Sequence, residues 1–382
     1  MPTYINPEGV NNPWGIRLTD FHKRLAQVTP EEVAHYSDPK GGLEEAQSTF
    51  SDISKNTTRT IKSGREMRGG GKPKLFSMDS AKLRANDVSG IPQVLNHVQM
   101  VQYLEPSDTH GKGCNTCGYE TAGCSSACLS ESGQLASPAA HIAKEARTSM
   151  AWENPAQYLG LLNHGIQTFS RNAQKAGKTP VVRMGGTSES LLHLMQASEA
   201  IIAGNPETQF SEYSKVNVRD AIRPEQEVPA NHPNQFIIPS ITENTTTERM
   251  RQFRDQGRNM AVPFNRVPHS TYDPEITMVD RKNDRETFPT LASPVTGEAL
   301  GDATDIRVLD TAITGVAGGI VPLGAKSVQK TDASGKGTKK VQDTPFIREV
   351  NPDDQYAKLT ANTAARVDLP TRKGRTSSFR GE

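Results

Sequence analysis

The chain has 382 residues, of which 34% are hydrophobic and 5% aromatic, and its 44 basic and 43 acidic residues leave a formal net charge of +1. This balance argues against a protein that binds nucleic acid through bulk charge, and the lean apolar content predicts long segments outside any core. No apolar run is long enough to cross a bilayer, and the first residues lack the basic and apolar regions of a signal peptide. We therefore expect a protein of a reducing cytoplasm, without a membrane partner.

Residues 1–72 are predicted to form a flexible N-terminal arm. Apolar residues from Ile16 to Val28 allow one amphipathic helix, but most of the segment is polar. It ends in Gly69-Gly70-Gly71, which is typical of a hinge or linker. We expect a solvated arm, followed by an α/β core over residues 73–327.

Strands and helices alternate through the predicted core. The apolar patterns predict strands at 75–78, 98–104, 180–184, 209–214, 236–241, 260–264, 305–309 and 320–323, and helices at 138–152, 154–177, 191–204 and 245–257. Such alternation predicts an α/β fold with a mostly parallel sheet, in the form of a partial or irregular barrel. In such folds the functional loops lie at the carboxyl ends of the strands.

All four cysteines fall in one loop at residues 111–133, directly after the second predicted strand: Cys114, Cys117, Cys124 and Cys128. The Gly, Ser and Thr residues between them let the backbone turn back, so that clustered thiols can surround one centre. In a reducing cytoplasm such spacing favours metal ligands over disulfides, although a disulfide would fit an oxidising setting. The loop is therefore a predicted metal site, and the nearby His110 is a further candidate ligand.

Polar residues follow several of the other predicted strands. Arg183 is placed to bind a carboxylate or phosphate at the rim, or to form a buried salt bridge with a neighbouring strand. Lys215 and Glu243 follow the next two strands and are expected to face the same edge. The cysteine loop and the Gly185 turn are expected at this same edge, and two candidate functional loops on one edge are the main reason to expect an active site there.

Residues 328–382 form a basic C-terminal tail with Ser, Thr and Gly between the charges. We expect it to be solvated and flexible, and the alternative is a tether to nucleic acid or to an assembly.

Several short segments resemble bacteriophage proteins of the "gene product 88"-like family. They are CGYETAGCSSACL at Cys117, VVRMGGTSES at Val181, QFSEYSK, FIIPSITEN, NMAVPF, and GDATDIRVLD with GGIVPLGAKS, in order between Lys74 and about Ser327. Cys114 is outside the resemblance, and Gly185 and Glu189 depart from the Asn and Asp that family members usually carry. The resemblance implies a phage origin, location in the host cytoplasm or the virion, and other phage proteins as partners through the terminal arms.

The cysteine loop and the strand that ends in Gly185-Gly186 are also similar to the layout of radical S-adenosylmethionine enzymes. That resemblance implies that the last three cysteines hold three corners of a four-iron cluster. Gly185, Gly186 and Glu189, with Arg183 beside them, would then bind the S-adenosylmethionine. The cysteine spacing differs from the one usual in that superfamily.

A competing hypothesis includes Cys114. Four thiolates would close a zinc site that stabilises the loop and has no catalytic role. We therefore predict a phage-encoded metal-binding protein, accessory or virion-associated, with zinc or an iron–sulfur cluster, and a radical enzyme as the alternative.

Overall fold

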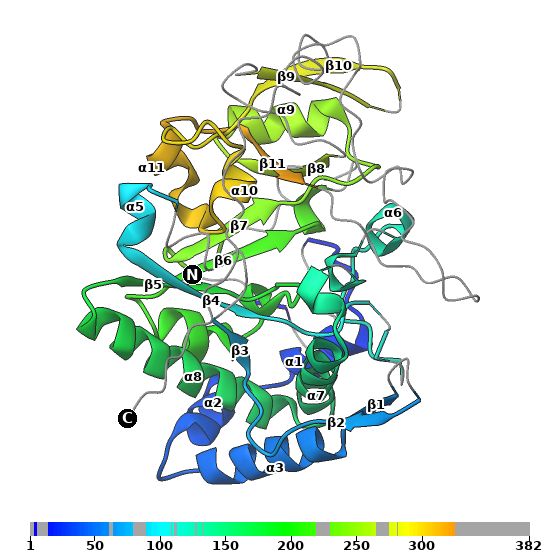
Figure 1. The fold of residues 1–382 in the computed structure, drawn as a ribbon, viewed down its shortest axis with the longest axis vertical. Coiled ribbons are helices and arrows are strands. Elements are labelled where there is room, and N and C mark those ends of the chain that lie inside the picture. The colour runs from blue at the N-terminus through cyan, green and yellow to red at the C-terminus, as the bar shows by residue number, and fades with distance from the viewer. Residues whose placement is uncertain are drawn as a thin grey trace.

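A five-stranded mixed sheet lies at the centre of the computed structural model, which describes residues 4–5, 14–60, 64–78, 89–107, 109–110, 113–126, 128–131, 133–218, 230–264, 275–280 and 282–324. In spatial order its strands are β3 (Phe76–Ser77), β4 (His97–Gln102), β5 (Thr179–Arg183), β6 (Gln209–Ser214) and β7 (Gln235–Pro239). Strands β4 to β7 pair in parallel, whereas β3 pairs antiparallel with β4 (Figure 1).

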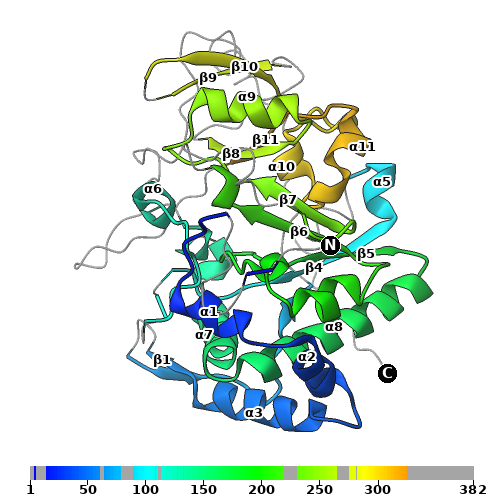
Figure 2. The same cartoon turned by 180° about the vertical axis from the view of Figure 1, so that it is seen from behind.

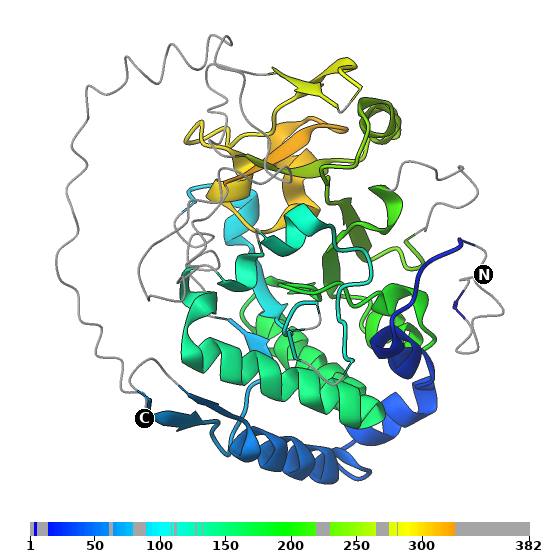
Figure 3. The same ribbon diagram turned by 90° about the vertical axis from the view of Figure 1, so that its right-hand side faces the viewer.

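The sheet is buried on both faces. Val182 of β5 belongs to the main hydrophobic core, and its neighbour Val181 belongs to a second core on the opposite face. Helices α7 (Pro138–Glu153) and α8 (Pro155–Lys175) cover the first face, and Figure 3 shows them as a layer below the sheet. Because neither face of β5 meets water, its sequence has consecutive apolar residues instead of alternation.

The N-terminal segment is folded onto this helix layer. Helices α1 (Asp20–Ala26), α2 (Pro30–Ser37) and α3 (Leu43–Asn56) pack against α7 and α8, and the hairpin of β1 (Thr58–Thr60) and β2 (Glu66–Arg68) follows them (Figure 2). The predicted solvated arm does not describe these residues, since Phe21, Val33 and Phe50 are buried in the main core. Capping boxes begin α1 and α2, and each helix buries only a narrow apolar stripe.

Helix α2 crosses α8 at Gly160. A Cβ atom at this position would lie 2.3 Å from the Cβ of Tyr36, so only glycine lets the two backbones approach so closely.

The remaining elements form the upper part of Figure 1. They are α5 (Pro92–Leu95), α9 (Thr247–Asp255), β8 (Met260–Phe264), β9 (Glu275–Val279), β10 (Arg285–Pro289), α10 (Leu300–Ala303), α11 (Asp310–Thr314) and β11 (Ile320–Gly324). Strands β8 and β11 pair in parallel, and β9 and β10 form an antiparallel hairpin that was not predicted.

The strands that the structure describes form no closed barrel. The main sheet ends at the two-residue strand β3 on one side and at β7 on the other, and a single bridge between Ser240 and Ala261 connects the β7 side to β8. The expected barrel on a mostly parallel sheet is therefore not confirmed, and the fold is mixed α/β.

Three local predictions are wrong. The helix predicted at 191–204 does not form, because Leu191 at its start has a left-handed backbone (φ 51°) and Met195 has an extended one (φ −107°, ψ 147°); only a 3₁₀ turn at Leu192–Leu194 and a π-helical turn at Glu199–Ala203 are present. The strand predicted at 305–309 is a loop and a 3₁₀ turn, where Asp305 and Arg307 are buried in ion pairs. Helix α9 is capped by Thr246 and not by Thr245.

The predicted tail at 328–382 lies outside the described residues. Among the helices of the described part, none is both long and apolar enough to span a membrane.

Candidate functional site

Four chain segments meet where the parallel strands end. The cysteine loop follows β4, the segment from Met184 to Ser190 follows β5, Lys215 follows β6, and Glu243 lies four residues after β7. The carboxyl ends of parallel strands share one edge of a sheet, which explains why these distant segments come together.

Three of the four thiols lie within electrostatic range of one another. Cys117, Cys124 and Cys128 are half-buried and interact electrostatically among themselves and with Lys215. Burial raises the pKa of Cys117 to about 12 and that of Cys128 to about 11, although the amides of Ser107 and Ser130 act in the opposite direction. Without a bound cation, Cys117 and Cys128 are therefore protonated at neutral pH.

Cys114 lies apart from this group. Its side chain is 0% exposed and belongs to the main hydrophobic core. Its electrostatic partner is Arg24, which lies in the last turn of α1. Burial raises its pKa to about 12. A buried, neutral cysteine behaves as a small apolar residue, so this thiol contributes to packing.

All four cysteines are free thiols. Within the described part of the chain, no group of three or more His, Cys, Asp or Glu side chains is arranged to hold a metal ion as it stands. A metal bound by Cys117, Cys124 and Cys128 would therefore have to draw the three sulfur atoms closer together. His110 does not join them, since its Nε2 atom lies 3.4 Å from Ser149 Oγ.

Lys215 is the cation of the site. Burial alone would lower the pKa of its ammonium, but attraction to Cys124, Glu189, Cys117 and Cys128 outweighs burial and raises the pKa. Among the described residues, none forms a hydrogen bond or ion pair with this ammonium group. A half-buried ammonium that forms no hydrogen bond or ion pair with a described side chain is suited to bind an anion.

Glu189 connects the surrounding segments. Its Oε1 atom accepts hydrogen bonds from Ser214 Oγ (2.5 Å) and from the backbone N–H of Lys215 (2.8 Å). Its own backbone N–H donates to Thr116 O (3.1 Å), and its carbonyl lies 2.7 Å from His22 Nε2. Burial raises the pKa of this carboxyl. The positive charge of Lys215 and the hydrogen bonds from Ser214 and the Lys215 N–H act in the opposite direction.

The glycine turn packs tightly against β4. The Gly186 N–H donates to Gln102 O (2.9 Å), and a Cβ atom at Gly186 would lie 2.3 Å from the ring of Tyr103. At Gly185 a Cβ would lie 2.5 Å from Ser188 O. Both glycines are thus needed for the packing of the turn itself.

Arg183 is engaged in a buried salt bridge. Its Nη1 atom lies 3.0 Å from Asp305 Oδ2, and its guanidinium lies over the ring of Tyr213, 4.5 Å from the centroid. Its Nη2 atom donates to Gly186 O (3.4 Å), so Arg183 braces the glycine turn from the opposite face of the sheet.

Glu243 holds the segment that carries Cys124. Its two carboxylate oxygens accept hydrogen bonds from Thr121 Oγ1 (2.6 Å) and Gly123 N–H (2.9 Å) at the start of α6 (Ala122–Ser126). On the other side of the loop, the Sγ atom of Cys117 lies 3.8 Å from Thr187 O, in the segment that follows β5. The thiols are thus positioned by segments from three different strands.

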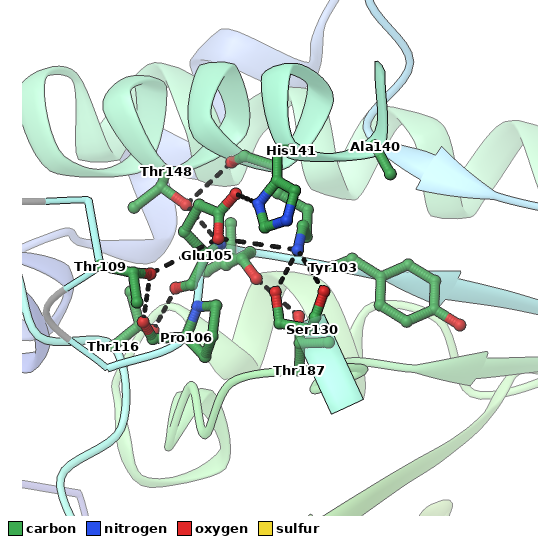
Figure 4. A network of polar contacts seen from close by, with 12 residues as sticks. Tyr103, Glu105, Pro106, Thr109, Thr116, Ser130, Ala140, His141, Thr148 and Thr187 are labelled. Atoms are coloured by element: carbon green, nitrogen blue, oxygen red, sulfur yellow. Dashed lines mark hydrogen bonds and ion pairs between the residues drawn. The ribbon is translucent and has the colours of Figure 1, made fainter. Parts of the chain in front are cut away.

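A buried polar network supports Cys128 from helix α7. Glu105 Oε1 lies 2.8 Å from His141 Nδ1, and Glu105 Oε2 lies 3.6 Å from the Nζ atom of Lys144. Lys144 in turn donates to Ser130 Oγ, and the Ser130 amide donates to the thiol of Cys128. Figure 4 shows Glu105, His141 and Ser130 gathered beside α7.

This network was not predicted from the sequence. His141 and Lys144 are 4% and 1% exposed. The available signal was their spacing of three on one helix, because a charged pair on the buried face of a helix requires a partner.

Comparisons with known proteins gave one finding about the family. A family model described as Gene product 88 matches residues 74–336. No curated protein and no solved structure matches the chain. The similarity to radical S-adenosylmethionine enzymes is not shown by these comparisons.

Proposed function

The chain belongs to the Gene product 88 family of bacteriophage proteins, and from this premise we propose that it binds an iron–sulfur cluster through Cys117, Cys124 and Cys128. One observation carries the proposal: these three thiols lie within electrostatic range of one another and of Lys215, whereas Cys114 is buried in the main hydrophobic core. A structural zinc site closes with four ligands, so the separation of Cys114 favours a three-thiolate centre over closed zinc.

The chemistry of the surrounding groups fits an anionic cluster. Three thiolates bring three negative charges, and the ammonium groups of Lys215 and Lys144 lie within electrostatic reach of Cys128. The Ser130 amide also donates to that sulfur. Cations and amide donors near cluster sulfurs stabilise the bound state and raise its reduction potential.

When bound, such a cluster would supply one-electron chemistry and one iron without a protein ligand. The chain's own contribution would be to place Lys215 beside that position. Its ammonium would attract a ligand with a carboxylate or phosphate, and Glu189 would hold the Lys215 backbone in place.

A radical S-adenosylmethionine-like enzyme is the second candidate. The contact between Cys117 Sγ and Thr187 O favours it, because this contact brings the predicted cofactor segment against the same thiols. In this proposal the cofactor would contact Gly185, Gly186 and Glu189. Arg183 would hold the glycine turn in place through its hydrogen bond to Gly186 O. The Gly186 N–H, the Glu189 N–H and Glu189 Oε1 already form hydrogen bonds within the protein. Only the other polar atoms of these two residues would be available to bind the cofactor.

We propose location in the host cytoplasm, where cysteines remain reduced, with association to the virion as an alternative. The N-terminal helices pack into the core, and we propose the basic tail at 328–382 as the contact with other phage proteins or nucleic acid.

The test is anaerobic purification followed by iron, sulfide and zinc analysis and a visible absorption spectrum. We expect about four iron and four sulfide per chain, with a broad absorbance that is lost in air. Cys124→Ala should lose the cluster, and the matched variant Cys114→Ala should retain it.

One zinc per chain that either variant removes equally would overturn the proposal in favour of a closed structural site. Absence of any metal from the anaerobic protein would overturn it as well. If the cluster is found, cleavage of S-adenosylmethionine under reducing conditions separates the two candidates, since only the radical enzyme predicts it.

A further inference from the structure

A groove with a volume of about 890 Å³ runs along helix α8, away from the cysteine loop. Its walls are α8, α3, the amino half of β4 and the segment 71–78 that includes β3. The α8 residues that line it extend from Leu161 to Ala173, which corresponds to about 18 Å along the helix axis. Its volume falls in the range of small-molecule sites.

The lining is mainly apolar and is accessible. Phe50, Leu161 and Phe169 are buried at its base, whereas Phe76 and Val98 are only half-buried. Met78 at its margin is 56% exposed, one of the largest exposures of an apolar side chain in the described part of the chain.

The ring of Phe76 lies directly on α8 because Gly165 has no side chain. A Cβ atom at Gly165 would lie 2.8 Å from this ring. The close approach fixes β3 over the helix and keeps the groove narrow.

The charge of the groove has one sign. Lys72, Lys74 and Lys178 line it, and none of the described residues in its lining is Asp or Glu. Nor does any of these three lysines form an ion pair with a described residue. In a chain whose basic and acidic residues balance, this is a local excess of positive charge.

We propose that this groove binds an amphipathic anion of the long-chain carboxylate class. The apolar chain would lie along α8 between Phe76 and Phe169, and the carboxylate would lie at the lysines of the margin. An apolar lining that includes three lysines and no described carboxylate is complementary to a ligand with an apolar body and an anionic end. The proposal is independent of any metal at the cysteine loop.

Isothermal titration of the full chain with sodium dodecanoate, below its micelle concentration, tests the proposal. We expect saturable binding of one molecule per chain, with an affinity that rises about fourfold for each methylene added between decanoate and tetradecanoate. Dodecanol, which lacks the charge, should bind at least tenfold more weakly.

Two pairs of variants locate the ligand. Thr168→Trp should fill the groove and abolish binding, whereas Gln174→Trp, on the same helix but outside the lining, should not. Replacement of Lys72, Lys74 and Lys178 by Gln should weaken dodecanoate binding at least tenfold, whereas Lys175→Gln should leave it unchanged.

Several outcomes would overturn the proposal. They are an unsaturable signal, equal affinity for dodecanoate and dodecanol, and equal binding by the two tryptophan variants. A concentration-dependent dimer in sedimentation velocity that Thr168→Trp abolishes and dodecanoate does not affect would show that a second copy of the chain occupies the groove. That result would replace the proposal.

Discussion

Glu243 and Gly123 are joined by a 2.9 Å hydrogen bond from the Gly123 amide to Glu243 Oε1, across 120 residues of sequence. This contact attaches the short helix that carries Cys124 to the segment beyond the last strand of the main sheet. The position of one thiol is therefore set by a residue far from the cysteine loop in sequence.

Replacement of Glu243 by Ala is expected to loosen this attachment. It leaves the Gly123 amide and the Thr121 hydroxyl without their acceptor, which costs about 1–3 kcal/mol of unfolding free energy when such groups are buried. Urea denaturation measures the cost, and the rate of Cys124 alkylation in the apo-protein should rise. The control Glu207→Ala, at an exposed site, should change neither quantity, and an unchanged alkylation rate in Glu243→Ala would contradict this role.

Lys144→Met is expected to destabilise the protein strongly. The change leaves Glu105 buried without its ammonium partner, for which a loss of about 3–5 kcal/mol is typical. Adding Glu105→Gln to the same chain should recover part of that loss, because the buried charge is then removed as well. If the double variant is no more stable than Lys144→Met in urea denaturation, the two residues are not energetically coupled.

His22 is expected to contribute to acid sensitivity. Burial lowers the pKa of its imidazole from 6.5 to about 4, while the contact with the Glu189 carbonyl acts in the opposite direction. The unfolded chain thus takes up a proton at higher pH than the folded chain, so stability is lost as the pH falls from about 6.5 to about 4. The slope approaches 1.4 kcal/mol per pH unit for a single proton.

His22→Gln removes this titration. The difference in unfolding free energy between the original protein and this variant should be constant above pH 7 and should change by that slope below pH 6. Parallel curves over the whole range would show that His22 does not titrate as its burial requires.

Gly186→Ala is expected to disturb the turn after β5. The added methyl group would lie 2.3 Å from the Tyr103 ring, and overpacking of this kind costs about 1–3 kcal/mol. Gly70→Ala is the matched control, because a Cβ at Gly70 would have no neighbour within 4 Å. Thermal unfolding compares the two, and an equal effect on both would mean that the turn accommodates the methyl group.

Much of the central sheet could be predicted from the sequence. Strands β4, β5 and β6 and helices α7 and α8 begin and end within two residues of their predicted limits, because proline, glycine and apolar runs mark them clearly. The hairpin of β9 and β10 was missed, although β9 alternates buried and exposed residues over its five positions, which is a strand pattern.

The candidate site was harder to predict than the sheet. The strand ends indicated that Lys215 and Glu243 would face the cysteine loop, since parallel strands share one edge. Cys114 lies in the main hydrophobic core, to which the N-terminal helices contribute, and Arg24 is its electrostatic neighbour. Spacing within one loop carries no information about a neighbour 90 residues earlier in the chain, so Cys114 was grouped with the others.

The close crossing of helices α2 and α8 at Gly160 and Tyr36 has a consequence for how the chain unfolds. The family match begins at residue 74, yet the helices before that point bury their apolar side chains in the same core as the matched part. A chain shortened to the matched residues would expose that core to water. The unit of folding cooperativity is therefore longer than the stretch by which the family is identified.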